Sequence, residues 1–255
     1  MNQHELPPDD YIMELAHKII EEAQNQGIIL RLIGSTAFRT HCPAHLKEFE
    51  KMARKLTDID TITYSSVSGA DIESLFTSLG LKEIQHMVWH ATTRRIFYDE
   101  HGLHIDVFYD KLDYCHTIDF KKRLELDYPT IPLAEMLLEK MQIVEINEKD
   151  LKDSVILLTE HAIGDSDDEQ INGRYISQLL SGDWGFYYTV KTNLEKVKRY
   201  SEGSELPENE VSAVRKRIDE LTAMIDTTPK SRGWKLRARI GIKKKWYKDV
   251  GDIER

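Results

Sequence analysis

Two aspartates one residue apart, Asp58 and Asp60, lie in the stretch LTDIDTITY, which is otherwise rich in Thr, Ile and Tyr. Side chains alternate faces along a strand, so both carboxylates are expected to point to the same side. Two neighbouring carboxylates repel each other unless a cation or protons compensate their charge. Because hard divalent ions such as Mg²⁺ prefer oxygen ligands of this kind, the spacing predicts a metal site. The alternative is a solvated turn that leads into a strand.

A third acid, Asp106, lies between two apolar residues in the segment LHIDVFYD, which is typical of a buried strand. A lone Asp in such a strand needs a partner for its charge. If this strand neighbours the one that carries Asp58 and Asp60, the three carboxylates converge on one point and could hold two metal ions. The metal-site interpretation therefore requires these two strands to lie side by side.

Two more residues before the aspartates could bind phosphate. The apolar segment 28–33 predicts a buried strand that runs into Gly34 and Ser35, after which a helix is expected to begin. Backbone N–H groups at such a helix start, together with the Ser hydroxyl, can bind a phosphate. The segment has neither the GK[ST] of a Walker A loop nor the three glycines of a dinucleotide-binding loop.

Lys140 lies within or beside the apolar stripe of a helix that is predicted to begin at Pro132. A cation in that position is costly unless an anion meets it. Two interpretations stay open. Lys140 either reaches the phosphates above the metal site, or it lies at the edge of the stripe with its ammonium group in water.

The hydrophobic pattern changes along the chain from mixed to helical. Before residue 130 it predicts a helix over 11–26, the strands described above, and a hairpin in which 84–98 pairs with 103–109. From Pro132 onward it predicts helices only, over 132–146, 148–161, 168–180, 184–199 and 207–226. This order favours an α+β fold with a mixed sheet flanked by helices over 1–130, a helical domain over 131–228, and a basic C-terminal tail over 229–255.

The charge of the chain is unevenly distributed. The net charge is −9, yet residues 230–248 contain nine Lys or Arg and no Asp or Glu, so the other 236 residues carry −18. The basic tail could bind an anionic polymer, or it could pack on the acidic body of its own chain. The two cysteines are far apart and no apolar run is long enough to span a membrane. We therefore expect a cytoplasmic protein without a signal peptide or a membrane partner.

A GS pair after a strand, a DxD on a strand and a later strand Asp between apolar residues together resemble the nucleotidyltransferase signature of the polymerase-β superfamily. The resemblance extends from about Ile28 to Tyr200 and, more loosely, through the tail. Several segments are similar to AbiEii-type, type IV toxin nucleotidyltransferases: LRLIGSTAFRTHCP, DIDTITY, HIDVFYDKLDYCHTI, RLELDYPTIPLAEMLLEKMQIVEINEKDLKD and SGDWGFYYTV. Two departures are a longer spacing from Ser35 to Asp58 and a shorter one after Lys140.

The resemblance implies a role for each matching residue. Gly34 and Ser35 match the phosphate-binding pair. The metal ligands and catalytic carboxylates would be Asp58, Asp60 and Asp106, and the last would also help to activate the attacking group. Lys140 matches the family's nucleotide-contacting lysine, and Asp153 matches a helical aspartate near the site, so both are expected to bind the nucleotide.

The function implied is Mg²⁺- or Mn²⁺-dependent transfer of a nucleoside monophosphate from an NTP to an acceptor hydroxyl. The basic tail makes RNA, for instance tRNA, a candidate acceptor, and the toxin-like resemblance makes an antitoxin protein a candidate partner. Two alternatives stay open: a non-catalytic protein that keeps the fold to bind a nucleotide or a partner, and a small-molecule adenylyltransferase.

Other polar residues near the third acid have simpler explanations. His101 and His104 form the pattern HxxHxD with Asp106, but they face opposite sides of a strand, so one metal ion is not expected to bind both. Arg94 and Arg95 lie on the same predicted hairpin. They could contact a substrate phosphate, or they could be ordinary surface arginines.

Overall fold

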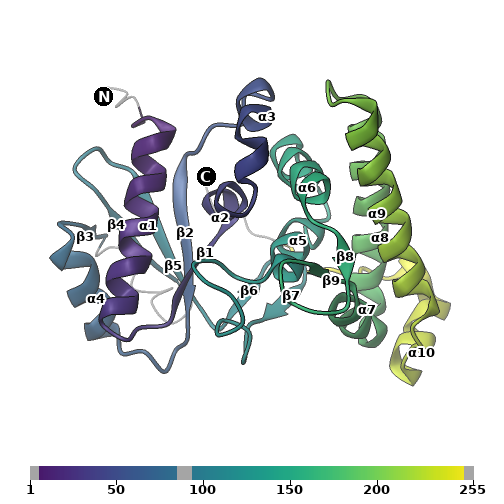
Figure 1. The fold of residues 1–255 in the computed structure, drawn as a ribbon. Coiled ribbons are helices and arrows are strands. Elements are labelled where there is room, and N and C mark those ends of the chain that lie inside the picture. The colour runs from purple at the N-terminus through teal and green to yellow at the C-terminus, as the bar shows by residue number, and fades with distance from the viewer. Residues whose placement is uncertain (1–5, 85–93, 250–255) are drawn as a thin grey trace. The chain divides into compact units, whose positions relative to one another are not determined.

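The computed structural model describes residues 6–84 and 94–249, while 1–5, 85–93 and 250–255 lie outside the described residues (Figure 1). The chain forms two compact units. The first comprises Met1–Pro43, Lys55–Leu112 and Asp119–Pro132. The second comprises Ala44–Arg54, Asp113–Ile118 and Leu133–Arg255. In the described part of the chain, no helix has both the length and the apolar character that crossing a membrane requires.

The first unit contains a five-stranded mixed sheet with the strand order β1-β2-β5-β4-β3. Its strands are β1 (Leu30–Ile33), β2 (Asp58–Thr63), β3 (Lys82–Glu83), β4 (Arg94–Tyr98) and β5 (His104–Tyr109). β2 is parallel to β5, and the other pairs are antiparallel. The predicted mixed sheet is thus confirmed. The predicted hairpin is confirmed for its described part, since β4 pairs with β5, while 85–93 lies outside the described residues.

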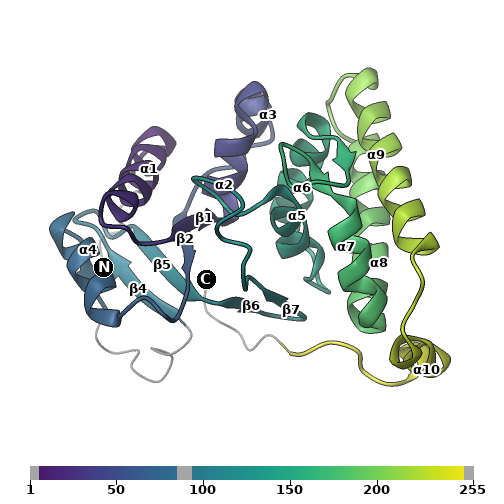
Figure 2. The same cartoon turned by 60° about the horizontal axis from the view of Figure 1, so that its bottom comes forward.

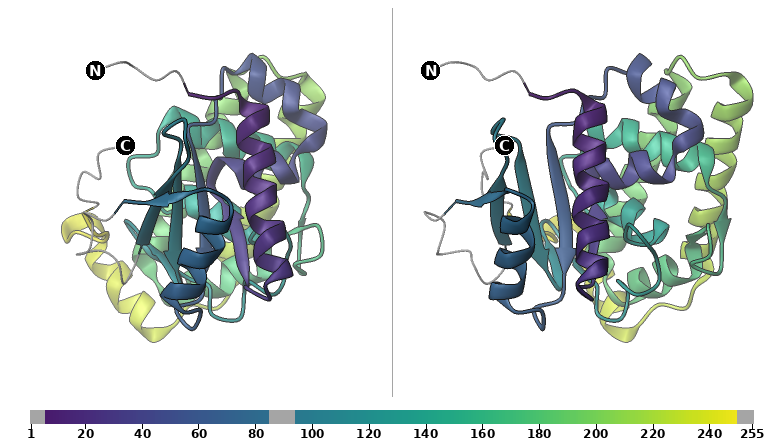
Figure 3. Two further views of the ribbon diagram at one scale, coloured as in Figure 1. Left: turned by 90° about the vertical axis from the view of Figure 1, so that its left-hand side faces the viewer. Right: turned by 60° about the vertical axis from the view of Figure 1, so that its left-hand side comes forward.

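Two helices of the first unit cover one face of this sheet. They are α1 (Asp9–Asn25), which buries an apolar stripe at helical spacing, and α4 (Gly69–Ser78), which begins where the Ser68 hydroxyl caps the Asp71 amide. Phe76 of α4 stacks on Phe97 of β4 with their ring centroids 4.2 Å apart. Figure 3 shows α1 in purple and α4 in blue against the same side of the strands.

The strand register separates an apolar face of the sheet from a polar one. Phe97 pairs with Ile105, and Ile105 pairs with Ile59, so these three side chains share the face that α4 covers. All three are fully buried or nearly so. Because faces alternate along each strand, Asp60 and Asp106 lie on the opposite face of the sheet.

The second unit is mainly helical. Its helices are α3 (Leu46–Lys51), α5 (Leu133–Met141), α6 (Glu148–Glu160), α7 (Gly173–Gly182), α8 (Trp184–Glu202), α9 (Glu208–Thr227) and α10 (Arg232–Ile240). Short strands β8 (Ile163–Gly164) and β9 (Ile171–Asn172) precede α7. A separate two-stranded sheet, formed by β6 (Lys111–Asp113) and β7 (Thr117–Asp119), has residues of both units. In Figure 2, α7, α8 and α9 run side by side.

Helix starts in the second unit follow side-chain caps. The side chain of Asn147 accepts a hydrogen bond from the Asp150 amide at the start of α6, and Asp183 caps α8 in the same way. Asn172 caps α7 through the Tyr175 amide. The pattern predicts a helix from residue 168, but α7 begins only at Gly173 because the cap is at Asn172 and β9 occupies the preceding residues.

The basic tail packs on helices of its own unit. The guanidinium of Arg237 lies over the ring of Trp184 at 4.7 Å, and Trp246 donates a hydrogen bond to the Thr189 hydroxyl at 3.1 Å. The Lys248 amide donates to the Cys115 carbonyl at 3.0 Å. The tail nevertheless presents a basic surface to solvent, because Lys243, Lys244 and Lys245 are exposed.

Candidate active site

The register of β2 and β5 brings the three predicted aspartates together in the first unit. Asp60 pairs directly with Asp106 across the parallel ladder, and Asp58 pairs with His104, two residues earlier on each strand. Paired residues on adjacent strands are about 4.8 Å apart at the backbone and point to the same face. Asp58, Asp60 and Asp106 therefore lie on one face of the sheet, opposite α4, and we refer to these three residues as the acidic cluster.

The main chain of Gly34 lies against this cluster. Ile33, the last residue of β1, pairs with Asp60, so Gly34 begins α2 (Gly34–His41) beside the Asp60 carboxylate. A Cβ at position 34 would lie 2.6 Å from Oδ2 of Asp60, closer than atoms can approach without moving. Gly34 also has φ +61°, in the left-handed region that favours glycine.

The start of α2 provides donors at the same place. Ser35 is buried in the first turn of the helix, and the Thr36 hydroxyl donates to the Ile33 carbonyl at 3.3 Å. The first amides of an α-helix have no acceptor within the helix, and the helix dipole makes this end positive. An anion can therefore be bound where α2 begins, next to the acidic cluster.

Asp106 is held by an arginine. Nε and Nη2 of Arg94 donate to its two carboxylate oxygens at 2.9 and 2.6 Å. Asp106 is only 4% exposed, and burial raises the pKa of its carboxyl, with the Arg94 guanidinium opposing this shift and the nearby Asp58 adding to it. Asp106 is thus a buried carboxylate whose charge the Arg94 guanidinium compensates.

The donor set of the cluster suits a hard divalent cation. Three carboxylates on one face supply the oxygen ligands that Mg²⁺ and Mn²⁺ prefer, and the glycine at position 34 keeps space for the Asp60 carboxylate. Within the described residues, no three His, Cys, Asp or Glu side chains are already arranged to hold a metal ion. Both oxygens of Asp106 are instead turned to Arg94.

Lys140 and Asp153 lie in the second unit, where they bind each other. Nζ of Lys140 is 3.1 Å from the Asp153 carboxylate and 3.0 Å from that of Asp150. Arg54 donates to both oxygens of Asp153 at 2.9 and 3.0 Å. Burial alone would lower the pKa of Lys140, but the carboxylates of Asp153 and Asp150 raise it above its ordinary value. Lys140 is therefore a permanent cation.

Sequence patterns do not identify every member of these clusters. From the sequence, Arg94 could be either a phosphate ligand or a surface arginine. Its contact with Asp106 depends on how β4 pairs with β5, which the sequence pattern does not determine. Arg54 follows the short helix α3 and reaches Asp153 across 99 positions of the sequence, which no local pattern signals. Asp150 precedes Asp153 by three positions on α6, so helical spacing could have suggested that the two share a face.

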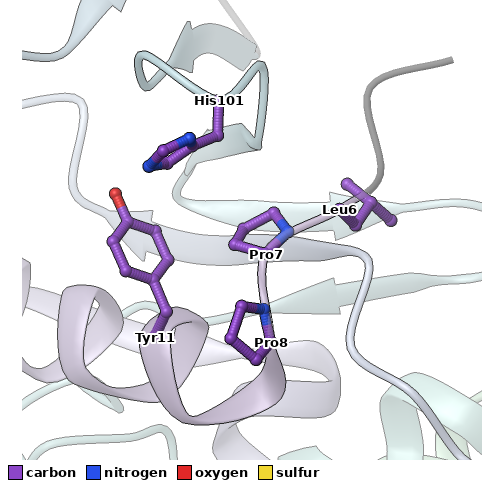
Figure 4. Close-up of a pocket in the computed structure, with 5 residues that line it drawn as sticks. All are labelled: Leu6, Pro7, Pro8, Tyr11 and His101. Carbon is purple, nitrogen blue, oxygen red and sulfur yellow. The ribbon is translucent and has the colours of Figure 1, made fainter.

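Two hollows of the first unit lie apart from the acidic cluster. One, of about 610 Å³, is lined by the residues drawn in Figure 4, where the Tyr11 hydroxyl points toward the His101 ring. Tyr11 donates a hydrogen bond to Asp99 at 2.9 Å. The other, of about 570 Å³, has Glu73, Glu83 and Arg95 in its lining. Neither is lined by Asp58, Asp60 or Asp106, so we assign neither to the chemistry of the cluster.

Comparisons with known proteins give structural similarity at low sequence identity. No family model and no curated protein sequence matches the chain. The antibiotic-resistance factor ANT(2'')-Ia is similar with a TM-score of 0.42 and 12% identity, over 68% of this chain and 95% of that one. An antigenic nucleotidyltransferase-like protein from Paracoccidioides brasiliensis is similar with a TM-score of 0.40 and 12% identity, over 89% of this chain and 97% of that one. At this level of similarity, the case for a function rests on the side chains of the site.

Proposed function

We propose that this chain is an enzyme that transfers a nucleoside monophosphate from an NTP to an acceptor hydroxyl in the presence of Mg²⁺ or Mn²⁺. The observation that carries the proposal is the gathering of Asp58, Asp60 and Asp106 on one face of the sheet, beside the start of α2. An acidic cluster next to an anion-binding helix start is the combination needed to hold a triphosphate together with divalent cations.

Each residue of the cluster has a part in this chemistry. The carboxylates of Asp58 and Asp60 would bind the divalent cations, and Asp106 would share one of them. The cations would supply positive charge to offset the charge of the phosphates. The amides that begin α2 and the Ser35 hydroxyl would bind the β- and γ-phosphates. Asp106, whose pKa burial raises, would accept the proton of the acceptor hydroxyl. A bond then forms between the acceptor oxygen and the α-phosphorus, and the bond to the departing pyrophosphate breaks.

The proposal includes two residues of the second unit. The sequence resemblance alone supports Lys140 as a nucleotide-contacting residue, and its ammonium group stays protonated because Asp153 and Asp150 raise its pKa. Asp153 would act by positioning, since its carboxylate fixes both Lys140 and Arg54.

RNA, for instance tRNA, is the acceptor class that we propose. Support comes from the nine Lys and Arg residues of 230–248, among which Lys243, Lys244 and Lys245 are exposed. Binding through such residues should weaken steeply with salt. A toxin role with an antitoxin partner is proposed from the sequence resemblance only. The two cysteines are buried thiols, which favours a cytoplasmic setting.

The test is a labelling assay with each α-³²P-labelled NTP, Mg²⁺ and total RNA. The wild-type protein is compared with the Asp58→Asn/Asp60→Asn double variant and with Asp10→Asn, which alters an exposed acid of α1. We expect label to enter RNA with the wild type and with Asp10→Asn, and not with the double variant. Equal labelling by the wild type and the double variant would exclude the proposed mechanism. Labelling by none of them would favour the non-catalytic alternative.

A further inference from the structure

We propose that Arg94 is an internal counter-ion of the acidic cluster, which positions Asp106 when no metal is bound and competes with divalent cations for its carboxylate. Arg94 thereby sets the metal affinity of the site. This inference rests on the proposed function, because it assumes that the cluster binds a divalent cation. Arg94 lies on β4 and contacts Asp106. The sequence pattern leaves open whether it binds a phosphate or is an ordinary surface arginine.

The contact between the two side chains is close and directional. Nε and Nη2 of Arg94 meet the two oxygens of Asp106 at 2.9 and 2.6 Å, which is the paired arrangement that guanidinium and carboxylate groups favour. The Arg94 guanidinium also lies over the ring of Phe108, 5.2 Å from its centroid. The side chain of Arg94 is 23% exposed and that of Asp106 is 6% exposed, so water screens the pair only weakly.

The register of β4 and β5 explains why this arginine, and not its neighbour, faces the cluster. Arg94 pairs with Phe108, which is two residues from Asp106 and therefore on the same face of the sheet. Arg95 pairs with Val107 on the other face, where its guanidinium meets both oxygens of Glu83 at 2.6 Å. The two adjacent arginines thus have the same chemistry on opposite faces, which makes Arg95 a matched control.

Charge balance makes the guanidinium and a metal ion alternative partners of Asp106. A buried carboxylate is costly when ionised unless a cation compensates it, and Asp58 adds a second negative charge nearby. In the metal-free protein Arg94 supplies that compensation. A divalent cation bound by the cluster would supply it instead, so the positive charge of Arg94 opposes metal binding and its hydrogen bonds must be shared or given up.

Two measurements on the purified 255-residue protein test this inference, with Mn²⁺ as the probe and no nucleotide present. Electron paramagnetic resonance gives the Mn²⁺ affinity of the wild type, Arg94→Gln, Arg94→Lys and Arg95→Gln. We expect Arg94→Gln to bind Mn²⁺ about tenfold more tightly, because an adjacent positive charge has been removed. Arg94→Lys and Arg95→Gln should stay near the wild-type affinity, the first because it keeps the charge and the second because it lies on the other face.

Thermal unfolding provides the second measurement. Arg94→Gln should lower Tm without metal, since Asp106 loses its partner, and saturating Mn²⁺ should close most of the gap to the wild type. Arg95→Gln should lower Tm by the same amount with and without Mn²⁺. If Arg94 merely orders the site, Arg94→Gln will instead bind Mn²⁺ with the wild-type affinity or more weakly. That result would overturn the inference about Arg94 and leave the proposed function standing. If the wild type binds no Mn²⁺, the inference and the metal-dependent function both fail.

Discussion

The Oδ2 atom of Asp60 occupies the space where a side chain at position 34 would begin, since a Cβ built on Gly34 lies 2.6 Å from it. The close approach follows from the antiparallel pairing of β1 with β2, in which Ile33 is the partner of Asp60. It joins the two halves of the candidate site. The helix start that would bind phosphate and the carboxylate that would bind metal are placed by one backbone contact.

Gly34→Ala is expected to displace the Asp60 carboxylate and to abolish most nucleotidyl transfer. The variant should also lose about 1–2 kcal/mol of unfolding free energy, because φ at this position is left-handed. Gly27→Ala is the matched control, since Gly27 has φ +72° and no atom of the described residues lies within 4 Å of where its Cβ would be. Urea unfolding should show that Gly34→Ala loses at least as much stability as Gly27→Ala, and the labelling assay should show that transfer is lost only in Gly34→Ala. Full activity of Gly34→Ala would contradict the role given to this contact.

Asp106→Asn should reduce the transfer rate by about a hundredfold or more, because an amide cannot accept the proton of the acceptor hydroxyl. The amide oxygen can still accept a hydrogen bond from Arg94, so the fold should survive the change. Single-turnover labelling with saturating NTP measures the rate, and circular dichroism checks the fold. A folded variant that transfers at the wild-type rate would remove Asp106 from the mechanism.

The elements that carry the acidic cluster could be predicted because their signals are local. An Asp between Ile105 and Val107 and the alternation around Asp58 and Asp60 each indicate a strand with defined faces. The α2 start after an apolar strand is a local signal of the same kind. What these signals leave open is the pairing of the strands. The metal-site interpretation requires the two acidic strands to be neighbours, and the pairing of Asp60 with Asp106 meets this condition.

Partners that depend on distant segments could not be predicted from the pattern. Alternation shows that Arg94 and Arg95 face opposite sides, but which of them faces Asp106 depends on the register set across the hairpin. The network of Arg54, Lys140 and Asp153 unites α5, α6 and the residue after α3, so no periodicity in one segment reveals it. Such ion pairs follow from tertiary packing, which local propensity does not encode.

Asp153→Asn should destabilise the protein by about 3 kcal/mol, because it leaves the buried charges of Arg54 and Lys140 with one carboxylate fewer. Glu148→Gln removes an exposed acid from the same helix, where it pairs with Lys152, and should leave stability almost unchanged. Urea unfolding at pH 7 compares the two variants with the wild type. Equal stability of Asp153→Asn and the wild type would show that the network does not need this charge.

His116 is buried in the second unit. Its Nε2 lies 2.8 Å from the Thr189 hydroxyl, and its ring stacks on Phe186 with centroids 4.8 Å apart. Burial lowers the pKa of His116 from 6.5 to about 4, with Asp183 opposing the shift and Lys248 adding to it. The folded protein therefore keeps this ring neutral at pH values where the unfolded chain takes up a proton.

The sign of the effect on stability follows from that difference in proton uptake. Unfolding is favoured as pH falls from 6.5 toward 4, because the unfolded state binds a proton that the folded state excludes. From pH 7 to pH 5 the contribution of His116 should cost about 2 kcal/mol of unfolding free energy. Urea unfolding at both pH values should show that loss in the wild type and in His17→Gln, which alters an exposed histidine of α1. In His116→Gln the loss of unfolding free energy between pH 7 and pH 5 should be smaller by about 2 kcal/mol. An unchanged loss in this variant would show that His116 is not the group that titrates.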